Sequence, residues 1–384
     1  MERLPTGRSI GLAHDYLLVM RGAERTFAAI ADMAPSAPIY TLLHDREGTS
    51  GRFDSHRIVT SPLQSLGVRQ KRFRALLPLF PYAAGRLSAT EHDVVVSSSS
   101  AFAHGIRTAP DAVHVCYCHT PFRYAWFERE RALAEVPRPV RPALDLTLRG
   151  IRRRDLRIAR KVTRYVANSR FCQERIRRFW NRDAPVIHPP VEVDRFVPGE
   201  PEDFFLIVSE VVRHKRLPLA LEAARRAGKR VVVVGEGPEL PKLQERYAGI
   251  HEFLGRVSDA DLERLYPRTL ALLVPGIEEF GIAAVEAQAA GRPVVGVDAG
   301  GLRETVIPGE TGQLVPEDDV DAMTEALAYT EFARFDAQRL RRNAERFSRE
   351  AFQHRLAAEV AGALRGDEGQ PPTASAYASS ISLE

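Results

Sequence analysis

The chain has 384 residues, of which 44% are hydrophobic and 27% are charged. This balance is typical of a globular chain with about two domains and excludes a fibrous or wholly disordered protein. Three cysteines, an odd number, argue against a disulfide framework and fit a reducing cytosol. Residues 1–16 lack the apolar segment of a secretory signal, and no apolar run reaches the roughly 18 residues that span a bilayer.

The net charge of +4 conceals two halves of opposite sign. Residues 1–200 contain 32 Lys and Arg against 20 Asp and Glu, a net charge of +12, and residues 201–384 contain 22 against 30, a net charge of −8. A basic half predicts an anionic partner, which could be nucleic acid, an anionic membrane or a phosphorylated substrate. Attraction between the halves across a shared cleft explains the same asymmetry without a partner.

The first half alternates short apolar segments with helical patterns. In chain order we expect a strand over 9–17, a helix over 22–34, strands over 91–96 and 112–119, a long Arg-rich helix over 143–164, a strand over 165–169 and a helix over 170–180. Five prolines between residues 185 and 201 then make 184–203 the candidate linker.

The pattern restarts after this linker. We expect strands over 204–210, 230–235, 251–257, 270–276 and 293–301, alternating with helices over 217–228, 238–248, 258–269 and 280–290. Ser258 and Asp261 resemble a capping box at the start of one helix. A helical region over 322–365 follows, and 366–384 has the composition of a disordered tail.

Continuous apolar strands alternating with helices indicate parallel sheets covered on both faces. The sequence therefore predicts an α/β protein with two doubly wound domains, over 1–198 and 199–365, and a disordered tail over 366–384. Open parallel sheets bind ligands at the carboxyl ends of their strands. Two such domains would place a ligand in a cleft between them.

Residues 275–295 place a carboxylate on either side of a small apolar segment. Glu278 follows the strand predicted over 270–276, and Glu286 lies inside the next helix, roughly 10 Å away at about 1.5 Å per residue. The first turn of that helix offers backbone N–H groups to an anion, and Gly281 allows a close approach. Carboxylates accept hydrogen bonds from hydroxyls but repel phosphate, so the layout suits a nucleotide sugar. Two glutamates on a solvated helix face are the structural alternative.

The segment EEFGIAAVE resembles the E-x7-E motif of retaining glycosyltransferase family 4, which has the two-domain GT-B fold. The segments ANSRF, HPPVEVDRF, VVVVGEGPEL, FLGRVSDADLERLY and GRPVVGVDAGGLRETVIPGETGQLV follow the order seen in that family. GLAHDYLLVMRGAERTF and CYCHTPFRYAW resemble its bacterial branch of O-antigen and exopolysaccharide mannosyltransferases. The resemblance covers roughly residues 8–362.

This resemblance implies a transferase that moves a sugar to a glycan or lipid-linked acceptor in the synthesis of cell-surface polysaccharide, with GDP-mannose as the preferred donor. Glu278 would hold the hydroxyls of the donor sugar, Lys215 would neutralise the departing diphosphate, and His119 would face the reacting sugar. The implied donor-binding residues are Glu286 for the ribose, Phe280, Gly281 and Ile282 for the diphosphate, Gly235, Gly237, Arg256 and Val257 around the base, and Gly22 near the phosphates.

The sequence departs from the family pattern at two positions. Glu210 occupies the place where the family often has an arginine, and Arg213 or Arg216 would then supply the second positive charge. Ala23 occupies the place where the branch usually has a second glycine.

Two patterns imitate metal sites. His114, Cys116 and Cys118 alternate along one predicted strand, and the period of a buried strand explains them without zinc. Asp259 and Asp261 form a D-x-D sequence, but they belong to the start of a helix. We expect no cofactor metal.

Two other protein classes compete with this interpretation. A nicotinamide dehydrogenase requires G-x-G-x-x-G after a strand, and neither glycine-containing loop has that spacing. A non-catalytic protein that binds nucleotide sugars or nucleic acid is compatible with the basic half, although no aromatic platform accompanies the charges.

The acceptor that the resemblance implies also indicates where in the cell the protein acts. An acceptor on a polyprenyl pyrophosphate lies at the inner face of the plasma membrane, so we expect a cytoplasmic protein bound peripherally to anionic lipid. The basic and apolar segment 68–87 and the arginines of 149–164 are the candidate surfaces. Packing of the apolar residues into the first domain is the structural alternative.

Overall fold

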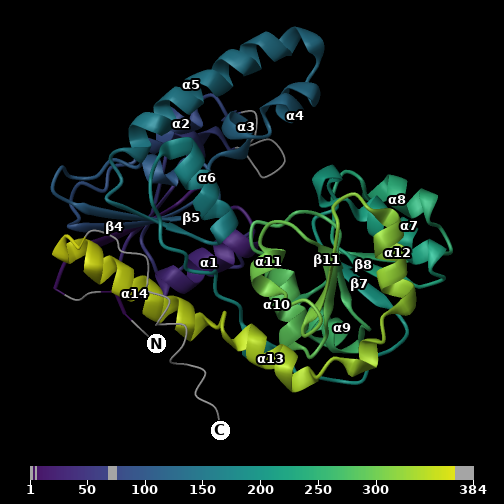
Figure 1. The fold of residues 1–384 in the computed structure, drawn as a ribbon. Coiled ribbons are helices and arrows are strands. Elements are labelled where there is room, and N and C mark those ends of the chain that lie inside the picture. The colour runs from purple at the N-terminus through teal and green to yellow at the C-terminus, as the bar shows by residue number, and fades with distance from the viewer. Residues whose placement is uncertain (1–2, 5–6, 68–75, 368–384) are drawn as a thin grey trace. The chain divides into compact units, whose positions relative to one another are not determined.

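The computed structural model describes residues 3–4, 7–67 and 76–367, which form two compact units. Unit 1 comprises Met1–His188 and Phe352–Glu384, and unit 2 comprises Pro189–Ala351 (Figure 1). Each unit is built on one six-stranded sheet in which every strand pairs in parallel with its neighbours. Both units are therefore the doubly wound α/β domains that the sequence predicts.

The sheet of unit 1 has the strand order β3-β2-β1-β4-β5-β6. Its strands are β1 (Ile10–His14), β2 (Ile39–Thr41), β3 (Ile58–Thr60), β4 (Val94–Ser99), β5 (Val113–Cys118) and β6 (Arg164–Ala167). Its helices are α1 (Gly22–Ala31), α2 (Phe80–Ala84), α3 (Arg123–Trp126), α4 (Arg129–Ala134), α5 (Arg141–Ala159), α6 (Arg170–Trp180) and most of α14 (Arg349–Arg365).

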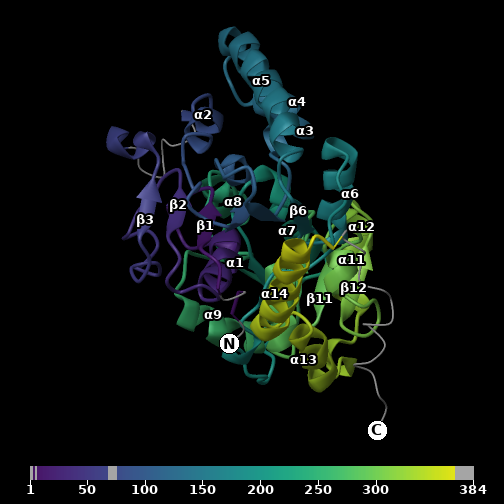
Figure 2. The same cartoon turned by 90° about the vertical axis from the view of Figure 1, so that its left-hand side faces the viewer.

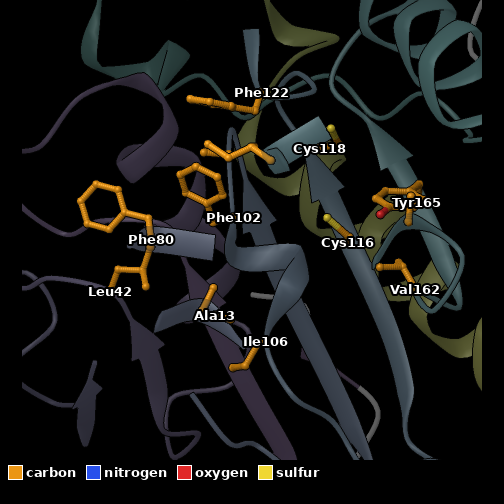
Figure 3. Packing of buried hydrophobic residues seen from close by; sticks show 14 of the residues in the cluster. Ala13, Leu42, Phe80, Phe102, Ile106, Cys116, Cys118, Phe122, Val162 and Tyr165 are labelled. Atoms are coloured by element: carbon orange, nitrogen blue, oxygen red, sulfur yellow. The ribbon is translucent and has the colours of Figure 1, made fainter. Parts of the chain in front are cut away.

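Alternate residues of the central strands supply two separate cores in unit 1. Val95 and Cys116 face α2, α5 and α6, whereas Val94, Val96 and Val115 face α1 and α14. The first core is rich in aromatic rings, and Figure 3 shows Phe80, Phe102 and Phe122 gathered beside the strands. The ring centroid of Phe102 lies 6.0 Å from that of Phe80 and 4.9 Å from that of Phe122. A sheet covered on both faces in this way has the continuous apolar strands that the sequence displays.

The sheet of unit 2 has the strand order β12-β11-β10-β7-β8-β9. Its strands are β7 (Phe205–Val208), β8 (Val231–Val234), β9 (Glu252–Gly255), β10 (Leu272–Val274), β11 (Val294–Val297) and β12 (Gly312–Val315). Its helices are α7 (Leu217–Arg226), α8 (Leu240–Arg246), α9 (Asp259–Leu265), α10 (Ile282–Ala289), α11 (Leu302–Thr305), α12 (Val320–Tyr329) and α13 (Ala337–Glu345).

The valines of β8 show how unit 2 is layered. Val231 and Val233 pack against α7, α8 and α12, and Val232 and Val234 pack in the core that contains α10 (Figure 1). On that second face, Gln288 of α10 accepts a hydrogen bond from Asn343 of α13 at 2.6 Å. This contact helps to fix the orientation of α10, which carries Glu286.

The C-terminal helix corrects the predicted domain limits. The prediction assigned the terminal helices to the second domain, but Gln353 of α14 donates to the carbonyl of Ala29 in α1 at 2.9 Å, and α14 and α1 lie side by side (Figure 2). The first break between the units falls at His188, inside the predicted linker but ten residues before the predicted limit at 198. Most of the predicted tail, 368–384, lies outside the described residues.

Most predicted elements are a few residues longer or shorter in the structure. Helix α5 ends at Ala159 and not at 164, because Arg182 donates to the carbonyls of Ala159, Val162 and Thr163. Strand β4 continues to Ser99 and not 96, because its serines bond to buried side chains in or directly after the neighbouring strands β1 and β5. The predicted helical region 322–365 is divided into α12, α13 and α14.

The carboxylate of Asp15, directly after β1, organises the loop that follows β4. It accepts hydrogen bonds from four consecutive backbone N–H groups, those of Ser100, Ala101, Phe102 and Ala103, at 2.5–3.0 Å. The side chain is only 3% exposed. Four backbone donors at the end of a buried strand are therefore satisfied mainly by one carboxylate, with the N–H of Ala101 also 3.3 Å from the hydroxyl of Ser99.

We expect Asp15→Asn to lower the free energy of unfolding by about 3 kcal/mol, because the amide nitrogen must face two of these N–H donors. Urea denaturation followed by circular dichroism measures the change. Asp111→Asn, at an exposed position of the same unit, is the matched control and should change stability by under about 0.5 kcal/mol. Equal stability of the two variants would contradict the role given to the Asp15 carboxylate.

Candidate functional site

The loop that follows β10 is held by close backbone contacts that only glycine permits. A Cβ at Gly276 would lie 2.8 Å from the backbone of Lys215, and one at Gly301 would lie 2.2 Å from the Cα of Phe280. Gly301 also donates its N–H to the carbonyl of Glu278 at 2.8 Å. The loops after β7, β10 and β11 therefore converge on Glu278.

Lys215 and Glu278 form an ion pair at this point. The Nζ atom of Lys215 lies 2.6 Å from both carboxylate oxygens of Glu278. Their side chains are 18% and 23% exposed, so solvent or a ligand can still reach them. Lys215 ends the short 3-10 segment η6 (Arg213–Lys215), 63 residues before Glu278. The sequence predicts each of the two residues, but not that they meet.

Helix α10 begins directly after Glu278 and Phe280. Gly281 precedes it with φ of +94°, a conformation that strains any residue with a side chain. Ile282 is the first helical residue, so the first turn has backbone N–H groups without partners inside the helix. The side chain of Phe280 is buried against Phe347, with ring centroids 5.2 Å apart, so only its backbone is available to a ligand.

Glu286 lies in the second turn of α10 and is half-buried. One of its carboxylate oxygens accepts a hydrogen bond from the hydroxyl of Tyr266 at 2.7 Å. Tyr266 belongs to the 3-10 segment η7 (Tyr266–Arg268) and is itself buried against Phe196. Tyr266 therefore positions Glu286, although no motif in the sequence connects the two residues.

Gly235 and Gly237 have a structural role in the loop after β8. A Cβ at Gly235 would lie 1.8 Å from the carbonyl oxygen of Ser209, and one at Gly237 would lie 2.1 Å from that of Val211. The loops after β7 and β8 are thus packed backbone against backbone. Arg256, after β9, is exposed, and Val257 packs partly into the core beside α10.

The two arginines considered as replacements at the Glu210 position differ in their surroundings. Arg216 pairs with Asp318, so its charge is already balanced within unit 2. Arg213 and Glu210 are both exposed. Of the two arginines, Arg213 is the more accessible to an anion.

Gly22 and His119 belong to unit 1, at the carboxyl ends of its strands. Gly22 starts α1, and its carbonyl accepts the hydroxyl of Thr26 at 2.9 Å. His119 follows β5 and lies 2.8 Å from the hydroxyl of Ser98 through Nε2. Burial is the main cause that lowers the pKa of His119 to about 3, so the ring is neutral at physiological pH.

The residues that imitate a zinc site are engaged in other contacts. His114 Nε2 lies 2.8 Å from the hydroxyl of Ser97, and burial raises the pKa of the Cys116 thiol, which disfavours the thiolate that zinc requires. Within the described residues, no three His, Cys, Asp or Glu side chains are grouped as metal ligands. Asp261 caps α9 together with Ser258, as predicted.

Two family models match the chain. The model for glycosyl transferases group 1 matches residues 191–347, and the model for glycosyltransferase family 4 matches residues 20–195. Among curated relatives, the D-inositol 3-phosphate glycosyltransferase of Mycobacteroides abscessus is 31% identical over 231 residues, which are 52% of this chain and 50% of that protein. The D-rhamnosyltransferase WbpZ of Pseudomonas aeruginosa is 32% identical over 157 residues, 39% and 41% of the two chains. The chain thus spans about half the length, or less, of the curated relatives that it matches.

Solved structures share the fold at low sequence identity. HepE from Anabaena, crystallised in complex with UDP, matches 92% of this chain and 100% of its own, with a TM-score of 0.67 and 17% identity. Sucrose-phosphate synthase from Thermosynechococcus elongatus matches 93% and 99%, with a TM-score of 0.68 and 17% identity. These likenesses establish the GT-B fold predicted from the sequence. Since the two family models together cover residues 20–347, the chain belongs to the family 4 glycosyltransferases.

Proposed function

We propose that the chain is a retaining glycosyltransferase that moves a sugar from a nucleotide-sugar donor to a glycan or lipid-linked acceptor during the synthesis of cell-surface polysaccharide. The observation that carries this proposal is the Lys215–Glu278 ion pair in front of α10. A cation, a carboxylate and the start of a helix thus lie together at the end of one strand. The cation and the helix start can bind a diphosphate, and the carboxylate can accept hydrogen bonds from the sugar attached to it.

In this proposal the two charged residues separate when the donor binds. Glu278 accepts hydrogen bonds from the sugar hydroxyls, and Lys215 turns to the diphosphate. A partly exposed ion pair contributes only about 1 kcal/mol, so a donor can replace it at small cost. As the glycosidic bond breaks, negative charge grows on the diphosphate, and a fixed cation stabilises that charge more in the transition state than in the ground state.

The backbone at Gly281 and Ile282 would bind the diphosphate, and Glu286, held by Tyr266, would accept the ribose hydroxyls. Gly235, Gly237, Arg256 and Val257 would surround the base. Arg213 is the better candidate for a second phosphate contact, because Arg216 is paired with Asp318. His119 and Gly22 of unit 1 would meet the donor sugar and its phosphates.

We infer GDP-mannose as the donor from the resemblance to polysaccharide mannosyltransferases. The names of two relatives support a hexose of this kind: the D-rhamnosyltransferase of P. aeruginosa and a phosphatidyl-myo-inositol mannosyltransferase of Mycolicibacterium smegmatis, 40% identical over 102 residues. HepE was crystallised with UDP and UDP-glucose, so a uridine donor is the main competitor.

The second candidate function is binding of a nucleotide sugar without catalysis. The packing role of Gly235 and Gly237 is compatible with either function, because it requires no chemistry. Incubation of the donor with and without acceptor separates the two, since a binding protein releases no nucleoside diphosphate in either case.

We also propose that unit 1 binds the anionic membrane surface on which a polyprenyl-pyrophosphate-linked acceptor lies. Helix α5 exposes Arg149, Arg152, Arg153 and Arg157, Arg160 directly after it is also exposed, and Leu146 of α5 is 70% exposed. Asp155 is buried and places no negative charge at the surface, whereas Asp145, one turn before Arg149, pairs with Arg149 at 2.8 Å and balances its charge. The basic segment 69–74 lies outside the described residues. None of the helices in the described part of the chain combines the length and apolar character needed to cross a bilayer.

We expect Lys215→Ala and Glu278→Ala each to reduce turnover by at least about tenfold, because each residue meets the donor in the transition state. Steady-state transfer assays measure the effect. Glu202→Ala is the matched control, because it breaks an exposed ion pair with Arg268 in the same unit and should leave turnover unchanged. The double variant should be at least as slow as either single variant. Recovery of turnover in the double variant would mean that the pair is only structural.

We expect GDP-mannose to stabilise the protein against heat more than other nucleotide sugars do, and to give an α-linked product in the presence of EDTA. The physical reason is that Lys215 and the start of α10 supply the positive charge for the leaving group. Thermal shifts with a donor panel and NMR of the product measure these outcomes. A β-linked product, or an absolute requirement for Mg²⁺ or Mn²⁺, would contradict the proposal.

We expect salt-sensitive binding to vesicles that contain anionic lipid, because each exposed Arg near such a surface contributes about 1 kcal/mol. Replacement of Arg152, Arg153, Arg157 and Arg160 with Ser should weaken sedimentation with vesicles, as should replacement of Arg69, Lys71, Arg72 and Arg74, while donor binding is retained. Arg225 and Arg226, already paired with Glu222, provide the control substitutions. Equal binding of all variants at low salt would refute the assignment of this surface.

A further inference from the structure

Three polar side chains meet at the carboxyl edge of the sheet of unit 1. Ser98 of β4 lies between His14, the last residue of β1, and His119, which follows β5. The Oγ atom of Ser98 is 3.1 Å from Nδ1 of His14 and 2.8 Å from Nε2 of His119. The three residues are 3%, 0% and 9% exposed, for His14, Ser98 and His119. A hydroxyl has only one hydrogen, so Ser98 donates to one ring and accepts from the other.

A carboxylate on α1 lies beside Nε2 of His14 and favours one direction for this chain of hydrogen bonds. Glu24 Oε1 lies 3.8 Å from Nε2 of His14, and the other oxygen of Glu24 accepts the backbone N–H of Arg21 at 3.1 Å. The His14 ring is stacked on Phe27 at 4.7 Å, which limits its rotation. An ionised carboxylate only accepts hydrogen bonds, so it favours a proton on Nε2 of His14.

The position of each proton from His14 through Ser98 to His119 can then be assigned. In a neutral His14 with its proton on Nε2, Nδ1 is an acceptor, so the Ser98 hydroxyl donates to it. The Ser98 oxygen must then accept from His119, which places the His119 proton on Nε2. The second nitrogen of His119, Nδ1, is left as a hydrogen-bond acceptor.

We propose that Glu24, His14 and Ser98 act as positioning residues that set the tautomer of His119, so that its Nδ1 accepts a hydrogen bond from a hydroxyl of the donor sugar. The choice of the sugar hydroxyl as the partner rests on the proposed function, whereas the tautomer does not. The tautomer matters because His119 is buried and neutral, with its pKa lowered to about 3 chiefly by burial. The position of one proton therefore decides whether the ring offers a donor or an acceptor.

The same strand contains a matched control. Ser97, the preceding residue of β4, has its hydroxyl 2.8 Å from Nε2 of His114, which is also buried and whose pKa burial also lowers to about 3. Ser97→Ala and Ser98→Ala each remove one buried hydroxyl that is hydrogen-bonded to a histidine. Ser97→Ala should change the tautomer of His114 and leave that of His119 unchanged.

Nitrogen-15 NMR of histidine-labelled protein at about pH 8.5, well above the ordinary histidine pKa of about 6.5, tests the proposal directly. His119→Gln identifies the His119 signals by their loss. We expect the wild-type protein to show the Nε2–H pattern for His119. Ser98→Ala should shift it towards a mixture of tautomers, Ser98→Thr should restore it, and Ser97→Ala should leave it unchanged. Glu24→Gln should move the His14 and His119 signals together.

Two results would overturn the proposal: a proton on Nδ1 of His119 in the wild-type protein, or an unchanged His119 pattern in Ser98→Ala. If Ser98→Ala does not fold, Glu24→Gln provides the same test, and an unchanged His119 pattern there has the same meaning. Transfer is measured separately, and Ser98→Ala is expected to lower kcat/KM by about tenfold with recovery in Ser98→Thr. A protein without transferase activity would refute the proposed function while leaving the NMR result intact.

Discussion

Parallel strands end with backbone groups that the sheet itself cannot satisfy, and both units of this protein are shaped by that constraint. In unit 1 the Asp15 carboxylate accepts four consecutive N–H groups after β4. In unit 2 the loops after neighbouring strands approach one another closely, and Gly301 donates to the carbonyl of Glu278. The two solutions differ chemically, but each fixes a loop at the strand ends, where the candidate functional residues lie.

A consequence of this arrangement is that backbone geometry positions the charged groups of unit 2. Lys215 reaches Glu278 because Gly276 has no side chain to separate the two loops, and α10 starts where it does because Gly281 accepts a positive φ. Glu286 depends on a different support, the buried hydroxyl of Tyr266. The carboxylates at the two ends of the E-x7-E segment are thus held by unrelated parts of the unit.

The sequence predicts the fold more completely than it predicts the contacts of the site. Apolar runs such as Val231–Val234 identify buried parallel strands, and the family motifs identify Glu278, Glu286 and Lys215. The pairing of Lys215 with Glu278 spans 63 residues and could not be read from either motif alone. The sequence predicts that β4 ends at Val96, but the serines after it continue the strand, because their partners His14 and His114 lie in neighbouring strands and His119 directly follows one. The sequence also does not predict that α14 packs on unit 1, because Gln353 of α14 bonds to Ala29, which lies 324 residues earlier in the chain.

The placement of α14 makes unit 2 an insertion within unit 1. Both crossings of the chain lie together at the base of unit 2, where the N–H of Val191 bonds to the carbonyl of Phe347 at 2.8 Å. Unit 2 is continuous in sequence and can fold as soon as its own residues are synthesised. Unit 1 is discontinuous in sequence. During synthesis the apolar surface of α1 and the central strands therefore stays uncovered until Phe352, Leu356 and Val360 have been made. The larger part of unit 1 leaves the ribosome first but completes its core last.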